Sequence, residues 1–168
     1  MELYDALLRR RSTRKFKSDK VSDSTVKELL IAAMSAPSAC NKTPWEFFVI
    51  RGEENLKRIL RASLFSRYDA PLAIVLCANL ENALPEPLCE YWVQDLSAAT
   101  ENILLRATDL GLGSVWCGIY PQETPMKRVC EILSLPDSMI PLNVILIGYP
   151  DEDLPPRTQY DEKKIHYL

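Results

Sequence analysis

The sequence from Tyr91 to Gly118 reads YWVQDLSAATENILLRATDLGLGSVWCG, and its first part has the pattern of a long amphipathic helix over residues 91–110. Its apolar side chains recur every three or four positions, which places them on one side of a helix. They are Trp92, Leu96, Ala99, Ile103, Ala107 and Leu110. A seam of this length is typical of a helix at the centre of a fold, or of a helix–helix contact in a dimer.

Three of the five glycines lie between Gly111 and Gly118. A GxG sequence can mark a dinucleotide-binding loop, but such a loop follows a strand and precedes a helix. Here a helix precedes the glycines and a strand is expected at 115–119, so Gly111 and Gly113 are interpreted as a helix stop and a turn. Gly118 lies at the end of that strand, where a glycine lets the backbone approach a ligand closely.

Further short elements are predicted on both sides of the long helix. Helices are expected over residues 2–9, 26–36, 53–62 and 124–133, and strands over residues 46–51, 72–77, 115–119 and 142–148. Strands and helices do not alternate regularly, so a doubly wound sheet is not expected. We predict instead a single α+β domain over residues 1–168, in which helices flank a small mixed or antiparallel sheet.

Capping residues predict where two of these helices begin. Residues 22–25 supply candidates for the N-cap of the second helix, and Thr25 with Glu28 would form a capping box. Thr124 followed by Pro125 is interpreted as the N-cap and first helical residue of the last helix.

Two segments carry no regular pattern. Residues 79–90, with two prolines, are interpreted as a loop or a lid, although their role is not readable from the sequence. Residues 150–168 form a polar tail with little apolar sequence of its own, which would lie across a partner subunit.

The composition excludes several classes of protein. The chain has 168 residues, of which 47% are hydrophobic and 26% charged, as in ordinary globular domains. No apolar run is long enough to cross a bilayer and no signal-peptide pattern is present, so a cytoplasmic location is expected. Five cysteines without a CxxC pair, together with a single histidine, argue against a zinc site and favour reduced thiols.

Residues 9–17, RRRSTRKFK, contain six basic and no acidic residues, although the whole chain has a net charge of −3. A compact anion explains this segment better than a long nucleic acid, which needs basic residues over a wider surface. Arg10 and Arg14 flank the hydroxyls of Ser12 and Thr13, and phosphate binds to such a mixture of donors. The alternative is a solvated basic turn.

Residues 37–45, PSACNKTPW, form a loop between two prolines that is dense in hydrogen-bonding side chains. It could present amide and hydroxyl groups to a polar heterocycle, or it could be an ordinary connection. The Walker A, GxSxG and HExxH motifs are absent, and the one histidine, His166, lies in the tail. Any chemistry is therefore expected to come from a cofactor.

Together these segments resemble the FMN-dependent nitroreductase family over nearly the whole chain. Residues 10–16, RRSTRKF, are similar to the family's RRSxRxF element, and residues 37–45 to its PSxxNxQPW loop. Residues 111–118 are similar to its GLGxxWxG segment, and GYP at 148–150 followed by PR at 156–157 to its GxP…PxR ending. All four motifs occur in the family's order, although Thr43 stands where the family often has Gln.

The resemblance implies a nitroreductase-like homodimer with FMN at the subunit interface. Arg10 and Ser12 would hold the phosphate, Arg11 would contact phosphate or ribityl, and Arg14 would reach the ribityl or the pyrimidine edge. The partner subunit would contribute residues of the 37–45 loop, namely Pro37, Ser38, Ala39 and Asn41.

The resemblance also assigns roles near the other end of the chain. Gly118 and Ile119 would offer backbone to the N5 and O4 edge of the flavin. Arg157 would return to the phosphate, and the tail would embrace the partner subunit. The flavin contact between residues 60 and 70 is not identified, with Ser63, Ser66 and Arg67 as candidates.

By this resemblance the protein is an NAD(P)H oxidoreductase that works in two half-reactions. NADH or NADPH would transfer hydride to the flavin and leave, and a nitroaromatic, a quinone or a similar small acceptor would then take its place. No side chain need act as acid or base, so no catalytic residue and no metal are assigned. Arg14 would stabilise the negative charge of the reduced flavin.

Other functions remain open. The same fold could support reductive dehalogenation or flavin-consuming chemistry. The protein could also store FMN or sense redox state with little turnover, or bind a partner through its basic segment without any flavin. The sequence does not identify the acceptor or the preferred nicotinamide.

Overall fold

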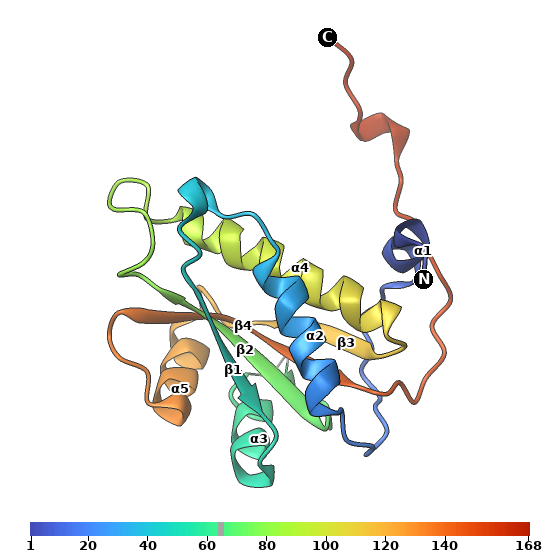
Figure 1. The fold of residues 1–168 in the computed structure, drawn as a ribbon, viewed down its shortest axis with the longest axis horizontal. Helices are drawn as coiled ribbons and strands as arrows, with labels where there is room; N and C mark the ends of the chain where they lie inside the picture. The colour runs from blue at the N-terminus through green and yellow to red at the C-terminus, as the bar shows by residue number, and fades with distance from the viewer. Residues whose placement is uncertain (64–65) are drawn as a thin grey trace.

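The computed structural model describes residues 1–63 and 66–168, and within them four strands form one antiparallel sheet (Figure 1). The spatial order is β1, β2, β4, β3, and the strands are β1 (Trp45–Ile50), β2 (Leu72–Asn79), β3 (Gly113–Gly118) and β4 (Met139–Gly148). β2 and β4 are the central strands and are buried on both faces, which accounts for their continuous apolar sequence. β1 and β3 form the two edges.

Helices cover both faces of the sheet (Figure 1). α2 (Asp23–Met34) and α4 (Tyr91–Asp109) pack on one face, and α3 (Glu53–Leu60) and α5 (Glu123–Leu133) pack on the other. Alternate residues of β2 point into these two cores, because side chains alternate across a strand. α1 (Leu3–Arg9) lies beside α4. The predicted α+β fold, with helices flanking a small mixed or antiparallel sheet, is confirmed, and the sheet is antiparallel.

The apolar seam predicted for the long helix is buried in the core between α4 and the sheet, from Trp92 to Ala107. The helix ends as predicted at Gly111, which has a φ of +73°. The N–H of Gly111 donates to the carbonyl of Thr108, and that of Leu112 donates to the carbonyl of Ala107. This pair of bonds is a Schellman motif, which uses carbonyls that the helix end would otherwise leave unpaired.

The N-cap of α2 lies among the predicted candidates, because Ser22 precedes Asp23 and its Oγ accepts the N–H of Thr25. Thr25 is therefore not the cap, and the capping box predicted for Thr25 and Glu28 is wrong. The predicted start of the last helix is also wrong. α5 begins at Glu123 after Gln122, which makes Pro125 the third helical residue rather than the first. A proline is tolerated there because the N–H groups of a first turn have no helical partner.

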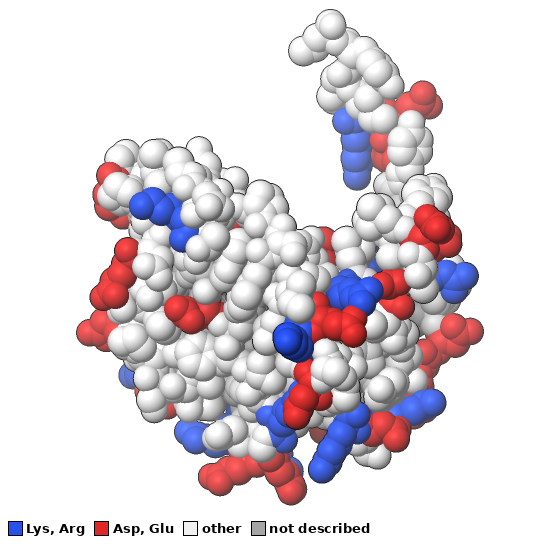
Figure 2. Space-filling view, in the orientation of Figure 1, with Lys and Arg blue, Asp and Glu red and all other residues white. Residues whose placement is uncertain are grey.

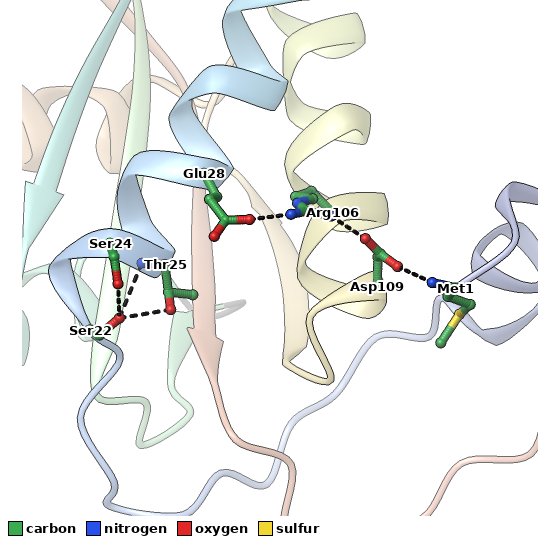
Figure 3. A network of polar contacts seen from close by, with 7 residues as sticks. All are labelled: Met1, Ser22, Ser24, Thr25, Glu28, Arg106 and Asp109. Carbon is green, nitrogen blue, oxygen red and sulfur yellow. Dashed lines mark hydrogen bonds and ion pairs between the residues drawn. The ribbon is translucent and has the colours of Figure 1, made fainter.

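The start of α2 is instead connected to α4 by ionic contacts (Figure 3). Glu28, expected in the capping box, forms an ion pair with Arg106 of α4. Arg106 also pairs with Asp109, whose carboxylate contacts the α-amino group of Met1 at 2.8 Å. This chain of charges holds α1, α2 and α4 together at one end of the domain.

The remaining segments agree with the expected pattern in outline. Residues 80–90 contain no regular helix or strand. The tail after residue 150 has only one short turn, Glu162–Lys164, and it extends away from the rest of the chain (Figure 1). Across the described ranges, no helix is both long and apolar enough to cross a membrane.

Candidate functional site

The basic segment runs along the free edge of β3. Ser12 forms a parallel bridge with Ser114, and the N–H of Thr13 donates to the carbonyl of Ser114 at 3.0 Å. Thr13 and Ser114 are both buried. A Cβ on Gly113 would lie 2.6 Å from the Thr13 side chain, so a glycine is required for this approach. The contact fixes Arg10, Arg11 and Arg14 beside the end of the sheet.

Glu152 fixes the other side of the basic segment. Its Oε1 accepts the N–H of Arg14 at 2.6 Å and the N–H of Lys15 at 3.2 Å. These bonds to the backbone favour the ionised carboxylate and lower the pKa of Glu152 below its ordinary value. No motif in the sequence indicates Glu152 as part of the site.

The Glu152 contact makes the stability of the segment depend on pH. Because the pKa is lowered in the folded state, the contribution of Glu152 is present above the ordinary glutamate pKa and is lost as the pH falls through the lowered value. Glu152→Gln should therefore melt at a lower temperature than the wild type at neutral pH. The difference should disappear at acid pH, in thermal unfolding followed by circular dichroism. A difference that is constant from neutral to acid pH would contradict this assignment.

The arginine side chains have different partners. Arg10 Nε lies 3.5 Å from Glu101 Oε1 of α4, and burial raises the pKa of Glu101 while Arg10 opposes this. Arg14 Nε donates to the hydroxyl of Tyr68 at 3.2 Å, and the guanidinium lies 5.7 Å from the centre of the Tyr68 ring. Tyr68 therefore orients Arg14 by a hydrogen bond and a cation–π contact.

Tyr68 was missed by the sequence reasoning, which proposed Ser63, Ser66 and Arg67 for the same region. Ser66 is fully buried, and its Oγ donates to backbone carbonyls at the end of α3, including that of Leu60 at 3.2 Å. That bond is structural and leaves Ser66 buried away from a ligand. Ser63 is buried too, whereas Arg67 is exposed. Residues 64–65, which belong to the same span, lie outside the described residues.

The tail returns to the basic segment. The N–H of Arg157 donates to the carbonyl of Leu8 at 3.0 Å, and Arg11 Nη1 donates to the carbonyl of Pro155. The backbone of Arg157 is thereby held at the end of α1, and its side chain is exposed. Five of the residues predicted to bind the cofactor therefore lie in one region, namely Arg10, Arg11, Ser12, Arg14 and Arg157.

Gly118 is the last residue of β3 and Ile119 follows it, but their backbone groups face different ways. The N–H of Ile119 donates to the carbonyl of Leu142 at 3.0 Å, and its side chain is fully buried. Along an antiparallel strand, residues whose backbone groups bond to the neighbouring strand alternate with residues whose groups point away from it. Gly118 is four positions from Ser114, so its N–H and C=O point to the free edge of β3, as those of Ser114 do. A Cβ on Gly118 would meet nothing within 4 Å. Gly118, rather than the N–H of Ile119, has backbone groups available to a ligand.

The 37–45 loop is held at the start of α4. The buried carboxylate of Asp95 accepts the N–H of Ala39 at 2.7 Å, and Ser38 Oγ accepts the N–H of Thr43 at 2.9 Å. Cys40, Asn41 and Thr43 all have positive φ, between 47° and 54°. Pro37, Ser38, Ala39 and Asn41 thus lie in one strongly bent loop whose shape depends on Asp95.

Removing Asp95 should release this loop. Asp95→Ala leaves the N–H of Ala39 without its partner, a loss of about 1–3 kcal/mol for a buried hydrogen bond to a charged group. We expect faster amide hydrogen exchange confined to residues 37–45, and weaker binding of any ligand that this loop contacts. Asp95→Asn should have smaller effects on both, because its amide oxygen can still accept the N–H of Ala39. Unchanged exchange in that loop of Asp95→Ala would refute the role of Asp95.

Within one chain the loop and the basic segment do not meet. The loop contacts α4 at Asp95, and the basic segment contacts it at Glu101. These two residues are about 9 Å apart along the helix axis and about 240° apart around it. Figure 1 shows the loop near one end of α4 and α1 near the other. The residues of the loop and those of the basic segment therefore form two separate groups within one chain, the first near Asp95 and the second near Glu101.

Comparisons with known proteins identify the family. The model of the nitroreductase family matches residues 7–67 and 63–149. A protein of Methanothermobacter thermautotrophicus named "Putative NADH dehydrogenase/NAD(P)H nitroreductase" is 39% identical over 168 residues, which cover 99% of this chain and 86% of the relative. The NADH dehydrogenase of Thermus thermophilus is 43% identical and covers 91% of this chain and 89% of its own length.

A solved structure extends the likeness to three dimensions. The FMN-dependent nitroreductase of Clostridium difficile R20291 has a TM-score of 0.88 and 32% identity, and the match covers 98% of both chains. The motifs quoted from residues 10–16, 37–45 and 111–118 all lie inside the range matched by the family model. The fold, the motifs and the relatives agree, and the chain therefore belongs to the nitroreductase family.

Proposed function

We propose that this protein is an FMN-dependent NAD(P)H oxidoreductase that acts as a homodimer on nitroaromatic, quinone or similar small acceptors. The observation that carries the proposal is the edge of β3. There the basic segment, with its guanidinium and hydroxyl groups, runs alongside β3 from Ser114, and the backbone at the last residue of the strand, Gly118, is free to bind a ligand.

The residues present fit FMN. Arg10, Ser12 and Arg14 supply the fork-shaped and hydroxyl donors that a phosphate and a ribityl chain accept. Arg157 would join them from the tail, because its backbone is fixed at the end of α1. The open space at Gly118 admits a flat ring close to the strand. Bound FMN would supply the redox chemistry, accepting hydride from NAD(P)H and passing it to the acceptor in two half-reactions.

The side chains around the proposed ring would orient it without acting as acid or base. Arg14, oriented by Tyr68, would place a positive charge near the pyrimidine edge and favour the reduced state. Cys117, beside Gly118, is buried, and burial raises the pKa of its thiol to about 12. It therefore remains a neutral thiol at physiological pH and is a poor nucleophile.

A second copy of the chain would complete the site. The 37–45 loop and the basic segment of one chain contact α4 at different residues, so the partner's loop would cover the basic segment. Figure 2 shows an uncharged area over the C-terminal part of α2 and the first half of α4. Ile31 and Met34 are exposed there, and the extended tail ends in exposed apolar residues, Ile165, Tyr167 and Leu168. Apolar surface of this kind is typical of an interface between subunits.

The absorbance spectrum of the purified protein, before and after adding FMN and desalting, tests the proposal. Retained flavin bands that NADH or NADPH bleaches without oxygen would support it, as would a mass of two chains in light scattering. If the protein retains flavin that neither NADH nor NADPH reduces, a storage or sensing function would replace the proposed enzymatic function. Failure to retain FMN would overturn the site itself.

A further inference from the structure

Four arginines gather on the α3 and α5 side of the sheet, and three of them lie on elements other than those of the proposed flavin site. Arg58 and Arg61 belong to α3 and its end, Arg67 follows α3, and Arg128 comes from α5. They line two hollows. One, of about 470 Å³, includes Arg61 and Arg67, and the other, of about 270 Å³, includes Arg58, Arg61 and Arg128. Arg61 lines both, so the hollows adjoin.

These guanidiniums are not neutralised within the described chain. Over residues 1–63 and 66–168, none of the four has a carboxylate within 4.0 Å, whereas Arg10, Arg51 and Arg106 each do. Among the described residues that line the hollows, the carboxylates are Asp69 and Glu131, and the lining also includes Lys57, which pairs with Glu53. The lining is therefore positive on a chain whose net charge is −3.

The dipole of α3 explains only part of this cluster. Basic side chains are favoured at the C-terminal end of a helix, which accounts for Arg58 and Arg61. Arg128 lies in the interior of α5 and Arg67 lies beyond α3, so neither is explained in this way. Arg61 shares one hollow with Arg67 and the other with Arg58 and Arg128, so basic side chains from separate elements line adjoining hollows, an arrangement that suits bound anions.

The chemistry and the position together select the ligand. Guanidinium groups bind phosphate with paired hydrogen bonds, and two small adjoining hollows suit separated phosphate groups on one small molecule. A nucleic acid would need a longer basic track. Arg67 directly precedes Tyr68, which contacts Arg14, so the cluster begins next to the proposed flavin site.

We propose that Arg58, Arg61, Arg67 and Arg128 form a second anion site that binds the phosphate groups of one small molecule. The ligand would be either the nicotinamide donor, whose 2′-phosphate distinguishes NADPH from NADH, or a free nucleotide with the same groups. The assignment of the nicotinamide donor as the ligand rests on the proposed function. The anion site itself does not, because it is independent of the flavin.

Isothermal titration calorimetry with adenosine 2′,5′-bisphosphate tests the site, using FMN-loaded protein so that Arg10 and Arg14 are occupied. The wild type should bind the bisphosphate and not adenosine. Arg61→Gln and Arg128→Gln should each weaken binding at least tenfold, with unchanged melting temperature and flavin content. Lys27→Gln, an exposed change of the same charge on α2, should not weaken it. No binding by the wild type, or an equal loss in the control, would overturn the site.

The kinetics of the same variants identify the source of the phosphates. A tenfold fall in the ratio of kcat/KM for NADPH to that for NADH, in Arg61→Gln, would support the donor as occupant. If this ratio is unchanged although bisphosphate binding is lost, the result would support a free nucleotide as the ligand and overturn the assignment of the donor. Flavin retention and bleaching by NADH test the proposed function separately, so its failure is not confused with failure of this site.

Discussion

Replacing Arg10 with alanine should weaken FMN binding roughly 30- to 150-fold. A hydrogen bond to a charged group contributes about 2–3 kcal/mol, and about 1.4 kcal/mol corresponds to a tenfold change in affinity. Arg10 is half-buried beside Glu101, which restricts its guanidinium to one region, so neighbouring arginines cannot easily replace it. The dissociation constant is measured by the quenching of FMN fluorescence as apoprotein is added.

Lys27→Ala is the matched control for Arg10→Ala, because it removes a positive charge from an exposed position on α2 and should leave the affinity within twofold. Arg10→Lys should recover only part of the loss, since an ammonium group cannot form the paired contacts of a guanidinium. If Arg10→Ala binds FMN within threefold of the wild type, the phosphate assignment is incorrect.

Replacing Gly113 with alanine should destabilise the protein and weaken FMN binding at the same time. The new Cβ would lie 2.6 Å from Thr13 Cγ2 and 2.7 Å from its Cβ and Oγ1, inside contact distance. Because Thr13 is buried and bonded to Ser114, the basic segment must shift. Overpacking of this kind costs about 1–3 kcal/mol, and each kcal/mol lowers Tm by about 2–4 °C in a chain of this length.

Gly52→Ala separates the clash at Gly113 from a general effect of replacing glycine, because a Cβ on Gly52 would meet nothing within 4 Å. It should leave Tm and the FMN dissociation constant nearly unchanged. A Gly113→Ala protein with wild-type Tm and wild-type FMN affinity would show that the contact between Thr13 and β3 does not position the segment.

Local sequence patterns predicted the elements well where burial decides them. The spacing of apolar residues in α4 and the continuous apolar sequence of β2 follow directly from which faces are covered. Helix starts were predicted less well, because several adjacent residues can cap and the choice depends on contacts outside the helix. Glu28 illustrates this, since its carboxylate binds Arg106 of another helix.

The candidate site was predictable where its residues are close in sequence and not where distant segments meet. The basic segment and the glycine-rich turn are contiguous motifs. Glu152, Tyr68 and Asp95 act through contacts with residues more than fifty positions away, and no spacing in the sequence indicates them. Which of Gly118 and Ile119 has a free N–H depends on the pairing of β3 with β4, which only the folded structure defines.

The attachment of the 37–45 loop and the basic segment to different sides of α4 has a genetic consequence. In the proposed dimer each site takes its loop from one chain and its arginines from the other. A mixed dimer of an Asp95→Ala chain and an Arg10→Ala chain would then concentrate both defects in one site and leave the second site wild-type. At an FMN concentration too low to fill either mutant site, co-expression of the two alleles would restore up to half of the activity of the wild-type dimer, by complementation between subunits.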